Sequence, residues 1–318
     1  MQLRYLILAI AVATPLAGAC DTAFPQRAQT AFSGEQALAY AQAQVAFGPR
    51  VPGTATSRKA GDWIVDQMRN RADTVVVQQW THVTTAGDTL PLRNILARFN
   101  PSATQRILYL THWDTRPKAD EDPVLGKRAG SFDGANDGAS GVGLFVALGD
   151  LLKKTPPAVG VDLLFVDGED WGSFDSYSDG KAPDVLIGST YFASHLPEPG
   201  YKPIFGVLFD MIGDKDLKIY EETNSLGMAP EVVGRVWQTA AELGYAKYFI
   251  QQDHGAITDD HVPLLKAGFH VIDVIDIEYA EPAPSSRNYH HTTMDTMDKI
   301  SAKSLQVVGD VAVKLITR

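Results

Sequence analysis

The feature that most constrains the fold is a series of short apolar runs that lack polar alternation and are separated by segments of helical periodicity. The runs are rich in β-branched residues and lie at 75–77, 95–97, 107–110, 163–166, 207–209 and 271–272. Strands without alternation are typical of a sheet that is covered on both faces. Because such strands alternate with helical segments, we expect an α/β fold with a mixed, mostly parallel central sheet sandwiched by α-helices.

Helical periodicity and capping residues predict the helices between these strands. Ser33 followed by Gln36 is a capping box for a first helix, and a second amphipathic helix carries Trp63, Ile64 and Met68 on one face. Further helices are predicted over 141–153, 189–195, 230–243 and 302–316. Since we find no internal repeat or linker, we expect residues 33–318 to form one domain.

The N-terminus predicts export. Residues 1–19 combine Arg4, a short apolar stretch and small residues before Cys20, which resembles a bacterial lipoprotein signal that is cut before a lipid-bearing cysteine. We expect residues 20–32 to be a tether and the protein to be periplasmic, attached to a membrane only through this anchor. Export without a lipid and a buried N-terminal strand are the alternatives.

Composition excludes several classes of protein. The 318 residues are 45% hydrophobic and 21% charged, which is typical of a globular chain. The formal net charge of −10 argues against a nucleic-acid partner, which would require a basic face. A single cysteine excludes an intramolecular disulfide and a thiolate metal site, so any metal ion must be bound by His, Asp and Glu. We expect a monomer.

Metal-capable side chains follow several of the predicted strands. Open α/β sheets bind their ligands outside the carboxyl ends of the strands, so we expect these side chains to converge. His and Asp ligands without Cys suit zinc. The residues are His112 and Asp114, Asp137 within the glycine-rich segment 134–141, Glu169 and Asp170, Asp210, and His290 and His291.

The order of these motifs resembles that of the zinc exopeptidase family, which includes bacterial aminopeptidases and glutaminyl cyclases. They are His-x-Asp, Gly-Ala-Asn-Asp-Gly-Ala-Ser-Gly, acid-Gly-Glu-Asp, Asp-Met-Ile-Gly and His-Thr-x-x-Asp-Thr. The resemblance implies a zinc ion bound by Asp137, Asp170 and His291. It also implies that His112 and Asp210 match the ligands of a second metal in the aminopeptidases, where the counterpart of Asp137 bridges both ions.

The resemblance implies the catalytic groups as well. Glu169 matches the general acid/base, and Asp114 is expected to orient the metal site through hydrogen bonds. Asp259, in Asp-Asp-His-x-Pro, resembles a cyclase carboxylate that joins a hydrogen-bond network with the general acid/base and the acid matching Asp210. The alternative for Asp259 is a loop acid that caps the helix at Val262.

Other residues bear on the choice between the two reactions. The segments that contain Trp113 and Trp171 resemble those of bacterial cyclases, and both side chains are predicted to contact substrate. The alternative for Trp171 is a position in the hydrophobic core. Tyr289 and His290 are expected to line the same pocket. His290 stands where cyclases generally carry Trp, and Asp295 followed by Thr296 is closer to the aminopeptidases.

The sequence therefore predicts a zinc-dependent glutaminyl-peptide cyclotransferase that acts on peptide or protein N-termini. An aminopeptidase with one or two zinc ions is the alternative, and a non-catalytic binding lipoprotein is a third. Asp170 in place of the commoner Glu shortens one ligand arm by a methylene group, so the number of metal ions stays open.

Overall fold

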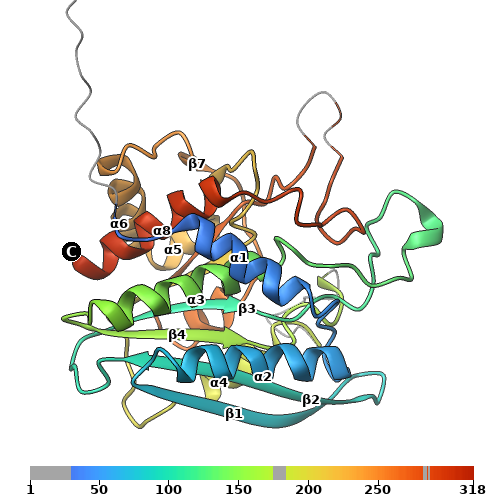
Figure 1. The fold of residues 1–318 in the computed structure, drawn as a ribbon, viewed down its shortest axis with the longest axis horizontal. Coiled ribbons are helices and arrows are strands. Elements are labelled where there is room, and N and C mark those ends of the chain that lie inside the picture. Colours follow the sequence, from blue (N-terminus) through green and yellow to red (C-terminus); the bar gives the residue numbers. More distant parts are fainter. Residues whose placement is uncertain (1–29, 175–183, 282–284, 286) are drawn as a thin grey trace, which may run out of the picture.

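A mixed six-stranded sheet crosses the centre of the molecule (Figure 1). The computed structural model describes residues 30–174, 184–281, 285 and 287–318. The strand order is β1-β2-β4-β3-β5-β8. Strands β4, β3, β5 and β8 pair in parallel, whereas β2 pairs antiparallel with both of its neighbours, β1 and β4. These strands are β1 (Thr74–Val83), β2 (Thr89–Phe99), β3 (Arg106–His112), β4 (Gly160–Val166), β5 (Phe205–Asp210) and β8 (Val271–Ile275).

Helices cover both faces of this sheet. One layer, in front of the sheet in Figure 1, contains α1 (Gly34–Val45), α2 (Ala55–Arg69), α3 (Ala139–Lys154) and α8 (Ala302–Thr317), with α6 (Pro230–Glu242) beside α8. The opposite face packs against α4 (Ile187–Ser194) and α7 (His261–Lys266). The short helix α5 (Thr223–Met228) lies between α6 and β8, and a 3₁₀ turn spans Leu125–Lys127.

The central strands are buried on both faces, as the lack of alternation predicts. In β3, Ile107 and Tyr109 belong to the core under α3 and α8, whereas Leu108 and Leu110 belong to the core under α4 and α7. The Tyr109 hydroxyl donates a hydrogen bond to the carbonyl of Ala312 in α8, at 2.8 Å. The two cores therefore fix the position of β3, whose end carries part of the site.

The predicted α/β architecture is confirmed, as are the strands and helices expected from the sequence. Ser33 caps α1, since its hydroxyl accepts a hydrogen bond from the backbone N–H of Gln36. The described residues also contain elements that were not predicted: α5, the 3₁₀ turn at Leu125–Lys127, and a two-stranded parallel sheet of β6 (Ile219–Glu221) and β7 (Phe249–Asp253).

The expected signal peptide, Cys20 and most of the expected tether lie outside the described residues. The end of the tether is folded, because Phe32 is buried and its backbone carbonyl accepts a hydrogen bond from Gln306 of α8. The folded domain therefore includes residues before Ser33. Among the described residues, no helix is long and apolar enough to span a bilayer.

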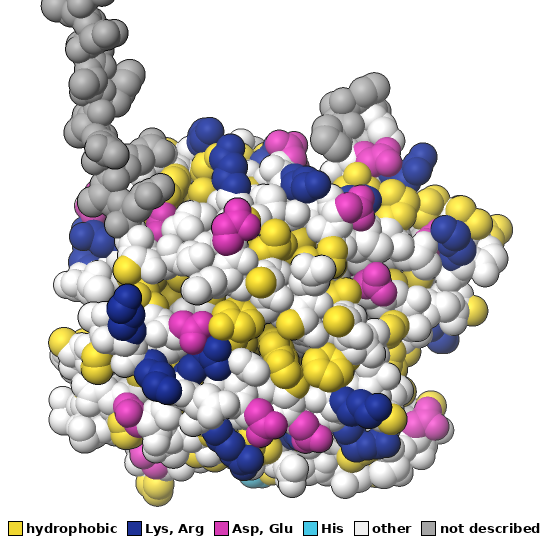
Figure 2. Space-filling view, viewed as in Figure 1, with side chains coloured by type: hydrophobic (Ala, Val, Ile, Leu, Met, Phe, Trp, Pro, Cys, Tyr) yellow, Lys and Arg dark blue, Asp and Glu magenta, His cyan; other side chains and the backbone are white. Residues whose placement is uncertain are grey.

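Strand order creates a crevice at the carboxyl ends of the central strands. The chain passes from β3 to β4 on one side of β3, and the following strand, β5, pairs with β3 on the other side. Ligands of open α/β sheets bind at such a switch point. The face in Figure 2 carries interspersed acidic and basic side chains, so it does not present a field of one sign.

Candidate metal centre

Two groups of metal-capable side chains meet at this crevice. His112, Asp137 and Asp210 form one group, and Asp137, Asp170 and His291 form the other. Nε2 of His112 lies 2.9 Å from Oδ1 of Asp137 and 3.1 Å from Oδ1 of Asp210. Nε2 of His291 lies 3.1 Å from Oδ1 of Asp170 and 3.6 Å from Oδ2 of Asp137. The structure thus brings together all five predicted ligands, with Asp137 shared by both groups.

Each of these side chains is placed by a defined local feature. His112 and Asp210 are the last residues of β3 and β5. Asp170 follows β4 after a turn at Gly168, where φ is +71° and a side chain would be strained. Asp137 precedes α3, and His291 lies in the loop before α8.

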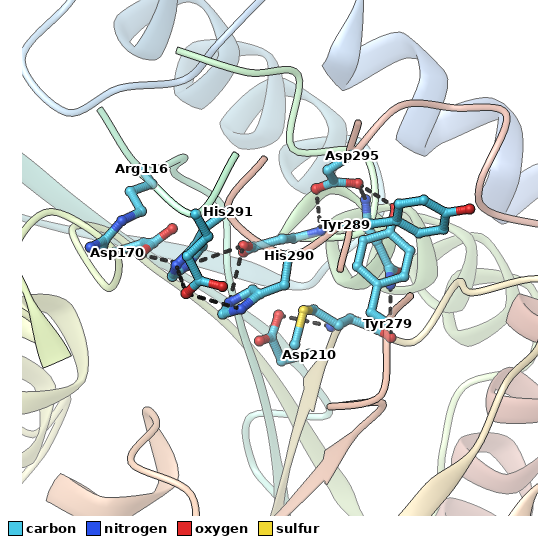
Figure 3. Close-up of polar contacts among 12 residues, drawn as sticks. Arg116, Asp170, Asp210, Tyr279, Tyr289, His290, His291 and Asp295 are labelled. Atoms are coloured by element: carbon cyan, nitrogen blue, oxygen red, sulfur yellow. Dashed lines mark hydrogen bonds and ion pairs between the residues drawn. The ribbon is translucent and has the colours of Figure 1, made fainter. Parts of the chain in front are cut away.

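Asp295 holds the loop that carries Asp137 (Figure 3). Its carboxylate accepts hydrogen bonds from the backbone N–H groups of Asn136, at 2.8 Å, and Asp137, at 3.2 Å. The hydroxyl of Tyr279 donates to the same carboxylate at 2.7 Å, and buried Arg50 donates to the carbonyls of Asp133 and Gly134. Protein groups therefore hold this loop at both of its ends.

The donor atoms fit a divalent metal ion such as zinc. Oδ2 of Asp137 and Oδ2 of Asp170 are buried without a hydrogen-bond partner, which costs free energy unless another group pairs with them. Carboxylate oxygens and imidazole nitrogens are zinc ligands. A cation at Asp137, Asp170 and His291 would satisfy both unpaired oxygens, so the buried polar atoms support the predicted set.

The charges around these groups shift their pKa values in the direction that their partners dictate. Burial raises the pKa of Asp137, but His112 and His291 outweigh burial and hold it well below its ordinary value. Burial lowers the pKa of His291, but Asp170 and Glu121 raise it to about 10. The carboxylates thus attract positive charge, whether it is a proton or a metal ion.

Glu169 lies beside the ligands and lines the cavity in front of them. Burial and, next, the charge of Asp170 raise its pKa well above the ordinary value of a glutamate. A carboxyl group with a raised pKa can both accept and donate a proton near neutral pH. Its position next to Asp170 therefore matches the predicted general acid/base.

Asp114 contacts both halves of this arrangement. Its carboxylate accepts hydrogen bonds from the backbone N–H groups of Glu169 and Asp170, and its Oδ1 lies 3.6 Å from Nδ1 of His112. Asp114 is fully buried. The geometry is that expected of a group that orients the site without binding substrate.

The cavity has a volume of about 320 Å³ and combines acidic and apolar walls. Asp259 and Asp210 form part of its lining, as do His290 and His291. Its apolar wall, which sequence reasoning missed, consists of Phe174, Met211, Ile257, Ile275 and Ile277.

Three aromatic residues predicted to contact substrate lie elsewhere. Trp113 continues the extended chain after His112, so its side chain points to the opposite face, where it packs in the main core. Trp171 packs against Leu90, Leu92 and Ile187, which agrees with the alternative of a core position. Tyr289 lies behind the cavity wall, edge-on to Tyr279.

Asp259 does not cap the helix at Val262 through its side chain. The residue before α7 is Asp260, which makes no side-chain capping bond. Asp259 accepts the N–H of Val262 with its backbone carbonyl and the N–H of Asp260, which precedes the helix, with its Oδ1. Its Oδ2 is buried without a partner. Arg116 and Glu121 also line the cavity, and the sequence predicted no role for either of them.

Two curated relatives carry different activities in their names. The chain is 28% identical over 185 residues to the aminopeptidase YwaD of Bacillus subtilis, covering 56% of this chain and 36% of that protein, or about a third of its length. It is 25% identical over 290 residues to the glutaminyl-peptide cyclotransferase of Bos taurus, covering 79% of this chain and 76% of that protein.

Solved structures share the whole fold. A Zn-dependent exopeptidase from Parabacteroides distasonis superimposes with a TM-score of 0.84 at 34% identity, over 92% of this chain and 100% of that one. The glutaminyl cyclase of Porphyromonas gingivalis superimposes with a TM-score of 0.82 at 40% identity, over 89% of this chain and 97% of that one.

The family follows from a match that includes every candidate metal ligand. The model described as peptidase family M28 matches residues 94–316, from β2 to the end of α8. Together with the shared fold, this match shows that the chain belongs to peptidase family M28.

Proposed function

We propose that this chain is a zinc-dependent glutaminyl-peptide cyclotransferase, which converts an N-terminal glutamine of a peptide or protein to pyroglutamate and releases ammonia. The similarity to the Porphyromonas gingivalis glutaminyl cyclase, at 40% identity over nearly the whole of both chains, supports this choice. The reaction is an intramolecular aminolysis, so the enzyme must fold the substrate, move one proton and keep water away from the reacting carbon.

The observation that carries the proposal is the position of Asp259. Its carboxyl group lines the same cavity as Glu169 and Asp210, and its Oδ2 has no partner within the protein. Burial and, next, the negative charge of Asp210 raise the pKa of Asp259 well above the ordinary value. Asp259 and Glu169 thus line one cavity as a pair of buried carboxyl groups, of the kind that proton-transferring sites use.

The residues divide the chemical work between them. Zinc, when bound, would polarise the side-chain amide carbonyl of the substrate glutamine. Glu169 accepts a proton as the α-amine nitrogen bonds to the amide carbon. Glu169 then donates that proton to the amide nitrogen as its bond to this carbon breaks, so that ammonia leaves. The apolar wall of Ile257, Ile275 and Ile277 limits the access of water to the same carbon.

A second candidate, an aminopeptidase, is favoured by one specific observation. Asp137 belongs to both metal-capable groups, and His112 and Asp210 are both present and buried at the second one. Two metal ions that share a carboxylate are a common arrangement in aminopeptidases. In that reaction Glu169 would take its proton from water, and the products would be a free amino acid and a shortened peptide.

A paired assay of the purified protein separates the two. A Gln-peptide should yield ammonia and a cyclised peptide of unchanged residue number, while a Leu-peptide of the same remaining sequence should stay intact. Release of free leucine from an enzyme that leaves the Gln-peptide unmodified would reject the cyclase and support the aminopeptidase.

A further inference from the structure

Residues 116–122 contact two of the candidate metal ligands, Asp170 and His291. We propose that residues 116–122 position Asp170 through Arg116 and His291 through Glu121, so that the side chains are aligned to bind the ion. This inference rests on the metal centre, and it holds whether the enzyme cyclises glutamine or hydrolyses peptides.

Arg116 fixes one oxygen of Asp170 (Figure 3). Its Nη1 donates to Oδ1 of Asp170 at 2.9 Å and to the carbonyl of Gly172 at 2.7 Å. Its Nε and Nη2 donate to the two carboxylate oxygens of Asp120, each at 2.8 Å. Because Asp120 holds the guanidinium group bidentately, Arg116 has little freedom to turn away from Asp170.

This contact leaves the other oxygen of Asp170 for the metal. Oδ2 of Asp170 is buried and has no hydrogen-bond partner, whereas Oδ1 accepts from Arg116. A carboxylate that is held at one oxygen presents the other in a fixed direction. Arg116 therefore acts on the ion through Asp170, which makes it a positioning residue.

Glu121 does the same for His291. Its Oε1 lies 3.3 Å from Nδ1 of His291, and its backbone N–H donates to the carbonyl of His291 at 3.2 Å. A carboxylate that accepts from Nδ1–H leaves the lone pair on Nε2, the nitrogen that faces Asp170 and Asp137.

Asp122 connects residues 116–122 to the loop that carries His291. Asp122 is buried, and its carboxylate accepts from the backbone N–H of Thr293 at 3.0 Å and from the Thr293 hydroxyl at 2.5 Å. Residues 116–122 and 291–293 are thus connected at Glu121 and Asp122. A displacement of one segment would move the other, and with it His291.

Glu121 also forms a group with His290 and His291 that could bind a metal ion directly. That use would require Nδ1 of His291 as a ligand while Nε2 faces the buried carboxylates, and a neutral imidazole has only one free lone pair. The geometry therefore favours hydrogen bonding by Glu121 over direct binding. The two roles give different stoichiometries of bound zinc.

The test measures zinc affinity by chelator competition in Arg116→Gln, Arg116→Lys, Glu121→Ala and Glu121→Gln. Arg116→Gln and Glu121→Ala have matched controls in the ion-paired residues Arg98 and Glu198. The side chains of Arg98 and Arg116 are both 8% exposed, and those of Glu198 and Glu121 are 49% and 45% exposed. Arg98→Gln and Glu198→Ala lie at the opposite end of the sheet. Thermal unfolding of the metal-free proteins identifies any variant that is misfolded.

We expect Arg116→Gln and Glu121→Ala each to raise the dissociation constant for zinc about 10- to 100-fold, while the controls leave it unchanged. Glu121→Gln, which keeps an acceptor for Nδ1–H, should lose less than Glu121→Ala. Asp120→Asn should weaken zinc binding in the same direction, and Arg116→Gln with Asp120→Asn should be no worse than Arg116→Gln alone. The visible absorption of Co²⁺-loaded Arg116→Lys should also shift, since the Asp170 ligand would be reoriented.

Wild-type zinc affinity and an unchanged Co²⁺ spectrum in the folded Arg116 and Glu121 variants would overturn the proposal. A loss of one bound zinc per chain in Glu121→Ala, with the affinity of the rest unchanged, would also overturn it, because Glu121 would then be a ligand. Since no assay of cyclisation enters the test, failure here leaves the proposed reaction unaffected.

Discussion

The carboxylate of Asp114 accepts a hydrogen bond from the backbone N–H of Glu169, 3.2 Å away, and thereby connects the end of β3 to the segment after β4 that carries this candidate acid/base. Its second oxygen accepts from the N–H of Asp170 at 3.3 Å. One buried side chain thus sets the backbone position of a candidate ligand and of the candidate acid/base.

Asp114→Asn should lower zinc affinity and kcat/KM, each about 10- to 100-fold, because an asparagine amide has one acceptor atom and two backbone N–H groups need one each. The free energy of unfolding should fall by about 1–3 kcal/mol. Asp184→Asn is the control, since Asp184 is also buried and accepts a backbone N–H, from Thr85, away from the metal centre. Wild-type zinc affinity in folded Asp114→Asn would contradict this role.

Glu169→Gln should reduce turnover by about 10²- to 10⁴-fold, since a glutamine side chain cannot carry the transferred proton. Zinc content should stay that of the wild type, because Glu169 is adjacent to the candidate ligands and belongs to none of the metal-capable groups among the described residues. Steady-state kinetics and metal analysis of the same preparation check both parts. If the variant lost its metal together with its activity, the separation of ligand and proton carrier would be wrong.

Gly138→Ala should disrupt the centre through steric contact alone. A Cβ atom at Gly138 would lie 2.6 Å from the carbonyl oxygen and 2.7 Å from Nε2 of His112, so either His112 or the Asp137 loop must move. We expect a loss of about 1–3 kcal/mol in unfolding free energy and weaker zinc binding. Gly126→Ala, where a Cβ meets nothing within 4 Å, should change neither quantity. Equal behaviour of the two variants would refute the argument.

Asp260 should make stability depend on pH. Burial raises its pKa from 3.8 to about 7, so between these values the folded protein holds a proton that the unfolded chain releases. The unfolded state binds fewer protons, and the contribution of Asp260 to stability therefore falls as pH rises from about 4 to about 7, by at most about 1.4 kcal/mol per pH unit.

Urea unfolding of the metal-free protein across this pH range checks the sign. Asp260→Asn removes the titration, so the stability of wild type relative to the variant should be highest near pH 4 and decline toward pH 7. A difference that is constant with pH, or that grows, would show that Asp260 is ionised in the folded state.

The central strands could be predicted because burial on both faces leaves a simple signal in the sequence. Residues 107–110 and 163–166 are apolar without interruption, and the structure places them in β3 and β4 between two cores. The strand β7 gave no such signal, because three of its five residues are exposed. Its pairing with the three-residue strand β6 depends on tertiary contacts that a local pattern does not encode.

The convergence of the candidate ligands could be predicted for the same reason that the fold could. His112 and Asp210 end buried strands, so the topology brings them to one edge, and the order of the motifs identified the rest. The cavity wall could not be predicted, since Ile257 and Ile277 lie outside the helices and strands and carry no periodicity. Trp113 was misassigned because the alternation of side chains along an extended segment turns it away from its neighbour His112.

The most direct test of the account is anomalous diffraction at the zinc absorption edge from crystals of the zinc-loaded protein. The account predicts a peak within bonding distance of Asp137, Asp170 and His291, with Glu169 adjacent to the ion and outside bonding distance. A zinc peak that is remote from these three side chains, or bonded to Glu169 in place of Asp170, would contradict it.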